Sequence, residues 1–75
     1  MDRQKLIDTI VYLVLHEVIP RMKRGAVIVN DGLACGEQFI SATHIGEIAL
    51  MVCDGTVSRQ KVHELFTLTM EANHR

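Results

Sequence analysis

The sequence predicts a mainly α-helical small domain, with three helices and a short irregular or two-stranded β segment at residues 26–36. Two observations predict this class. Apolar residues recur at the three-and-four spacing of a helical face in three separate stretches, and glycines at positions 25, 32 and 36 interrupt the helical pattern between the first two stretches. We expect residues 1–75 to form a single domain, because a second one would have too little apolar surface to offset the entropy of ordering it.

The first helix is expected to begin after Asp2, whose carboxylate can cap the free amides of the first turn. Pro20 should end this helix near Ile19 or bend it there. The β-branched run within the stretch also suits a buried strand, but the flanking polar residues keep the helical period. Its predicted apolar stripe comprises Leu6, Ile7, Ile10, Val11, Val14, Val18 and Met22, with Tyr12, His16 and Glu17 directed elsewhere.

The stretch from Ala26 to Gly36 predicts a short hairpin or an ordered loop. Apolar residues at 26–29 and 33–35 flank Asn30-Asp31-Gly32, and an Asp-Gly pair between apolar runs favours a hairpin turn. The segment is long enough for a minimal two-stranded ribbon only.

A helix, a tight turn and a second helix are predicted between Ser41 and Met70. Ser41 can cap the first of these helices, and Ser58, with Thr56 as the alternative, can cap the second. Gly55 supplies the left-handed backbone that ends the first helix. The C-terminal residues 71–75 are expected to fray. The two apolar faces comprise Ile45, Ile48, Ala49 and Val52, then Val62, Leu65, Phe66 and Met70.

Three side chains are predicted to bind a partner. The run from Ile48 to Cys53 is apolar on every side of its helix, so Leu50 and Met51 lie on a second apolar face, available to another chain. Tyr12 lies off the stripe of the first helix, where its amphipathic ring suits a contact surface.

The charge balance does not favour nucleic acid. Eight basic and nine acidic side chains give a net charge of −1, which offers little attraction to phosphate. The basic cluster Arg21, Lys23 and Arg24 is the candidate phosphate contact of this alternative, although basic groups also suit a helix C-terminus. A DNA-reading helix-turn-helix is disfavoured, because Asp54 and Lys61 fall at positions that this motif buries.

No cofactor, metal site or catalytic centre is predicted. The spacings among the histidines, Cys35 and Cys53 match no compact zinc-ligand pair, and no nucleophile has a base and an orienting group placed by the sequence. The chain is therefore not expected to be an enzyme. The apolar run from Ile10 to Leu15 is too short to span a membrane, and two cysteines without a CxxC pair or a secretory signal favour a reduced, cytoplasmic setting.

Residues 40–70 resemble the helical tail shared by the B subunit of tRNA-dependent amidotransferases and YqeY-type proteins. The chain departs from this pattern at Val62 and His63, where the family has an Ala-Lys pair. The resemblance implies a helical module that docks onto the outer body of tRNA or onto a protein, without chemistry of its own. The matching residues are Ile40, Ser41, Ile45, Glu47, Ile48, Asp54, Gly55, Thr56, Val57, Ser58, Glu64, Leu65, Phe66 and Met70.

The function predicted from the sequence is that of a small non-catalytic regulatory protein. We expect it to bind a larger protein partner in a transcription or translation machine, for example as a virus-encoded modulator of host RNA polymerase. Self-association into a homodimer is a further expectation, because a core of this size leaves only about 3 to 5 kcal/mol of net stability. The alternative is a helical accessory module that binds RNA, tRNA or DNA.

Overall fold

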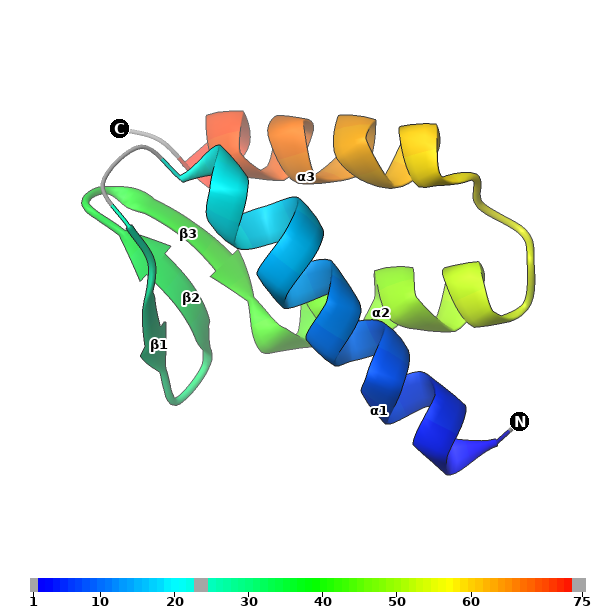
Figure 1. Ribbon diagram of the computed structural model, residues 1–75. Helices are drawn as coiled ribbons and strands as arrows, with labels where there is room; N and C mark the ends of the chain where they lie inside the picture. Colours follow the sequence, from blue (N-terminus) through cyan, green and yellow to red (C-terminus); the bar gives the residue numbers. More distant parts are fainter. Residues whose placement is uncertain (1, 23–24, 74–75) are drawn as a thin grey trace.

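The structure, a computed structural model, describes residues 2–22 and 25–73, and it confirms the mainly α-helical class. The order of elements is a first helix in three parts, a β meander and a helical hairpin (Figure 1). The bounds are α1 Arg3–Tyr12, η1 Leu13–Val18, η2 Ile19–Arg21, β1 Val27–Val29, β2 Gly32–Cys35, β3 Gln38–Ser41, α2 Ala42–Cys53 and α3 Arg59–Asn73.

The first helix changes its winding within its length. After α1, the segment η1 is a π-helix and η2 is a 3₁₀ turn that contains Pro20. Pro20 therefore ends the helix as predicted, since Met22 has extended backbone. The predicted apolar stripe is wrong in part, because Ile7 and Val11 are exposed, whereas Glu17 is buried. The wider π turn advances the inward face by five residues, from Leu13 to Val18.

The β segment is larger than predicted, because a third strand follows the hairpin. β1, β2 and β3 form an antiparallel meander in that order, in which Ile28 pairs with Leu33 and Leu33 pairs with Ile40. The segment Gln38–Ser41, where no strand was predicted, forms β3. Ile40 of β3 is fully buried, so this strand contributes to the core.

The helical hairpin forms as the sequence predicts. Ser41 Oγ accepts a hydrogen bond from the His44 amide at 3.1 Å, and Ser58 Oγ accepts one from the Lys61 amide at 3.2 Å. Gly55 has a φ of 73° in the turn between α2 and α3. Ser58 is therefore the cap of α3, and Thr56 instead donates to the Met51 carbonyl.

One core joins the helices to the inner face of the sheet. Its largest fully buried side chains are Phe66 and Val62 of α3, Ile48 of α2, Ile40 of β3 and Val18 of η1. α3 packs along β3, and α1 packs across α2 (Figure 1). Among the described residues, no helix is long and apolar enough to cross a membrane.

Candidate functional site

An open cleft is lined by residues of the first helix, of α2 and of α3. Its volume is about 660 Å³. Its floor consists of apolar side chains from three elements, namely Leu13, Val52 and Val62. The remaining lining residues are polar, charged or aromatic, and comprise Asp2, Gln4, Lys5, Asp8, Thr9, Tyr12, Glu17 and Arg59.

A buried carboxylate is among the residues that line this cleft. The side chain of Glu17 is only 5% exposed, because the π turn directs it toward α3. Its Oε1 accepts a hydrogen bond from Arg59 Nη2 at 3.1 Å. Its Oε2 lies 2.6 Å from His63 Nε2. Arg59 and His63 are four residues apart, and so they reach Glu17 from one face of α3.

Tyr12, which also lines the cleft, contacts the arginine that pairs with Glu17. The guanidinium carbon of Arg59 lies 4.7 Å from the centroid of the Tyr12 ring, within the range of a cation–π contact. The other ring neighbour is His16, whose ring centroid is 4.8 Å away at an interplanar angle of 28°. The aromatic ring is thus held between two side chains while it remains exposed. We call Tyr12, Glu17, Arg59 and His63 the Glu17 cluster.

Within the Glu17 cluster, the negative charge of the carboxylate is paired with the positive charge of Arg59. Arg59 offsets the charge of Glu17 and is itself 68% exposed, so its other N–H donors can reach solvent or a bound group. Asp8 accepts a hydrogen bond from Gln4 Nε2, and Asp2 caps α1 by accepting from the Gln4 amide. The cleft therefore combines an apolar floor with a polar rim, an arrangement typical of binding sites.

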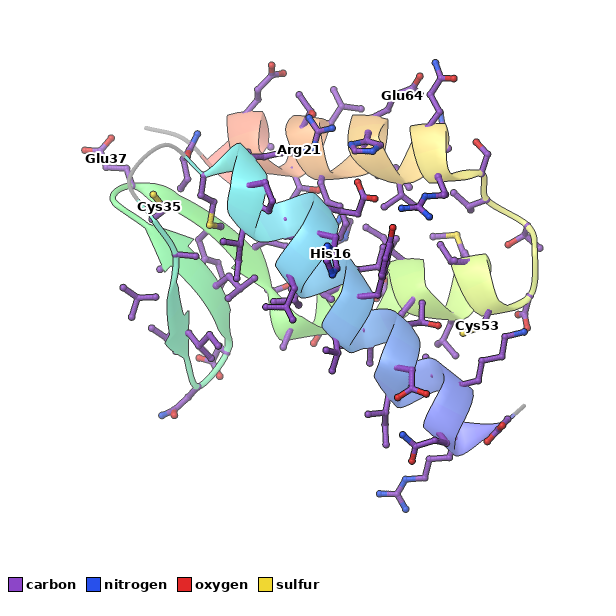
Figure 2. The ribbon with its side chains drawn as sticks, viewed as in Figure 1. His16, Arg21, Cys35, Glu37, Cys53 and Glu64 are labelled. Atoms are coloured by element: carbon purple, nitrogen blue, oxygen red, sulfur yellow. The ribbon has the colours of Figure 1, made fainter. Side chains whose placement is uncertain are left out.

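The residues predicted to bind a partner do not form one site. Tyr12 lines the cleft. Leu50 and Met51 are exposed on α2, as expected, but they do not line it. Arg21, the first residue of the basic cluster, is partly buried at the C-terminal end of the first helix (Figure 2). Lys23 and Arg24 lie outside the described residues.

Sequence reasoning missed three members of the Glu17 cluster. Glu17 was expected to point away from the apolar face, and nothing in the sequence relates it to Arg59 and His63, which lie more than forty positions later. The available signal was the four-residue spacing of Arg59 and His63, which gives two basic or polar groups on one helical face.

The thiols and histidines do not gather into a metal site in the described part of the chain. No group of three or more His, Cys, Asp or Glu side chains is arranged there to hold a metal ion. Figure 2 shows Cys35 in the sheet and Cys53 at the far end of α2, with His16 on the first helix between them. Cys53 instead packs against α1, with its Sγ 3.3 Å from Thr9 Oγ1.

Apolar side chains are also exposed away from the cleft. Ile7, Val11 and Leu15, spaced by four residues along the first helix, form an outward row that we call the α1 stripe. Val27, Ile28 and Val29 of β1 are exposed as well.

No protein-family model, curated protein or solved structure matches this chain.

Proposed function

We propose that this protein is a small non-catalytic regulator that binds a larger protein, a component of a transcription or translation machine in the cytoplasm. The observation that carries the proposal is the cleft beside the Glu17 cluster, with its apolar floor and its mutually compensated charges. A partner side chain can bury apolar surface on Leu13, Val52 and Val62 there. The polar rim can then set its orientation.

The state of the charged groups favours binding over catalysis. A general base needs an accessible lone pair near a reacting group, whereas the Glu17 carboxylate contacts both Arg59 and His63. Tyr12 and Arg59 are residue types that contribute strongly to protein interfaces. They lie against each other in the lining of the cleft. The resemblance of residues 40–70 to tails that dock onto tRNA or proteins supports a docking role too.

Site-specific photocrosslinking tests the proposal. A photoreactive phenylalanine analogue replaces Tyr12 in the cleft, and the same analogue replaces Gln60 as a control that is exposed on α3 and does not line the cleft. In a lysate of the organism that encodes the chain, the residue-12 probe should crosslink one larger protein. The residue-60 probe should not.

Two crosslinking results would contradict the proposal. Equal labelling from positions 12 and 60, or no labelling from position 12, would remove the cleft as a protein-binding site. Crosslinking to RNA from position 12 would favour the nucleic-acid alternative instead.

A further inference from the structure

Arg59 is held in one orientation by two contacts of different kinds. Its Nη2 donates to Glu17 Oε1 at 3.1 Å, and its guanidinium carbon lies 4.7 Å from the centroid of the Tyr12 ring. The ring contact uses a face of the planar guanidinium, whereas the N–H groups of arginine lie in that plane. An exposed arginine without such contacts samples many rotamers. Arg59 is therefore pre-organised, even though its side chain is 68% exposed.

Most of the N–H donors of Arg59 remain available in the cleft. An arginine side chain has five such donors, and within the described part of the chain this guanidinium makes one hydrogen bond, to Glu17. Glu17 does not depend on Arg59 alone, because its Oε2 lies 2.6 Å from His63 Nε2. Arg59 also lines the cleft. Its remaining donors therefore suit a further oxygen ligand that enters there.

We propose that Arg59 binds a side-chain carboxylate of the partner, from an Asp or Glu residue next to an apolar one; this rests on the proposed function, because it specifies the chemistry of the partner that the cleft binds. A guanidinium pairs with a carboxylate through two parallel N–H···O bonds, which a lysine ammonium cannot reproduce. The neighbouring apolar side chain packs on Leu13, Val52 and Val62, which line the same cleft. The partner segment therefore combines an acidic and an apolar side chain as neighbours.

The other charges of the cleft favour a single carboxylate over a chain of phosphates. Outside the Glu17 cluster, the charged side chains of the lining are Asp2, Lys5 and Asp8. At a helical rise of about 1.5 Å per residue, Asp8 lies about 6 Å and Asp2 about 15 Å from Tyr12 along the helix axis. A polyanion that followed the cleft would approach both carboxylates, and the net charge of the chain is −1. One carboxylate bound at the Glu17 cluster avoids most of this repulsion.

Nuclear magnetic resonance titration of the purified chain tests this preference. The probes are three blocked hexapeptides that each contain one leucine and differ at one other position, which is glutamate, glutamine or lysine. We expect the glutamate peptide to shift the Arg59 Nε–H signal and the methyl signals of Val52 and Val62, with a Kd of about 1 mM. It should bind at least about fivefold more tightly than the glutamine peptide, because a charged acceptor forms stronger hydrogen bonds. The lysine peptide should bind more weakly still.

Three substitutions at exposed positions identify the cation that receives the carboxylate. Arg59→Lys keeps the positive charge but removes the planar fork, so it should reduce the affinity ratio between the glutamate and glutamine peptides to about two or less. Lys5→Ala removes the other cation of the cleft, and Lys61→Ala removes a basic residue of α3 that does not line it. Both should keep the ratio within about twofold of wild type. Circular dichroism confirms the fold of each variant, and the comparison of peptides on the wild-type chain needs no variant.

Three results would overturn this assignment. The first is equal binding of the glutamate and glutamine peptides to the wild-type chain, or no binding of either up to about 10 mM. The second is a glutamate preference that Arg59→Lys keeps or that Lys5→Ala loses. The third is inorganic phosphate that shifts the Arg59 Nε–H signal at lower concentration than the glutamate peptide does, which would assign the site to phosphate.

These outcomes are distinct from a failure of the proposed function. Photocrosslinking from position 12 shows whether a protein occupies the cleft, whatever the charge of that protein. A crosslinked partner without any glutamate preference would overturn only the role of Arg59. A glutamate preference without crosslinking would instead overturn the proposed function and leave the carboxylate-binding chemistry of Arg59 in place.

Discussion

Glu17 holds a charge at a position where an apolar side chain would be at least as stable. Its carboxylate is 5% exposed, and its hydrogen-bonded partner Arg59 is 68% exposed. The cost of removing the carboxylate from water is therefore large, while solvent screens the attraction to Arg59. Proteins that retain such a residue commonly use it at a site.

Glu17→Met is accordingly expected to stabilise the fold. The linear Met side chain has a similar length and suits a cleft that Leu13 and Val62 also line, so the gain should be about 1 kcal/mol, or about 4 to 8 °C in Tm. Thermal unfolding measures this change. Glu64→Met, at an exposed position paired with Lys61, is the control and should change stability by less than about 0.5 kcal/mol. A clear loss of stability in Glu17→Met would show that the Glu17 contacts are net stabilising.

Alanine substitutions at two glycines should change the stability of the fold in opposite directions. A Cβ at Gly32 would overlap the Ile40 carbonyl oxygen, so β2 and β3 would have to separate. A Cβ at Gly46, inside α2, would have no neighbour within 4 Å. We expect Gly32→Ala to destabilise by about 1 to 3 kcal/mol and Gly46→Ala to stabilise by up to about 1 kcal/mol. Denaturant unfolding measures both, and equal changes would contradict the explanation.

At the scale of elements, the parts with local signals were predictable. Ser41 and Ser58 cap α2 and α3, and Gly55 ends α2, because each acts on amides or backbone within a few residues. β3 was missed because Gln38–Ser41 is short, and its pairing with β2 is decided by the burial of Ile40. The π-helix was missed because hydrophobic periodicity assumes 3.6 residues per turn, and this error also concealed Glu17.

α2 offers an element-scale test of partner binding. Leu50 and Met51 are exposed while Ile48 and Ala49 on the same helix are buried, so Leu50→Ser and Met51→Ser should leave the fold intact. If α2 contributes to the partner interface, the double variant should reduce crosslinking from position 12 by at least about fivefold. Leu68→Ser, on α3, is the matched control. Unchanged crosslinking would confine the interface to the cleft.

At the scale of the whole molecule, charge separates the two functional alternatives. The net charge is −1, and residues 1–25 carry five basic groups against three acidic ones. A protein that uses phosphate contacts releases counterions, so its affinity falls steeply as salt rises. A protein interface with an apolar centre changes little over the same range.

Measuring binding over a range of salt concentrations therefore distinguishes the protein-binding function from the nucleic-acid alternative. We expect the wild-type chain to bind a short single-stranded RNA no more tightly than about 10⁻⁴ M at physiological salt, by fluorescence anisotropy. We also expect the variant with Arg21, Lys23 and Arg24 changed to Ala to retain crosslinking from position 12. Tight binding that weakens by more than tenfold between about 50 and 200 mM salt, and that is lost in the triple variant, would favour the RNA-binding alternative. Binding lost equally in Lys61→Ala, a basic residue of α3 outside the cluster, would instead reflect nonspecific charge.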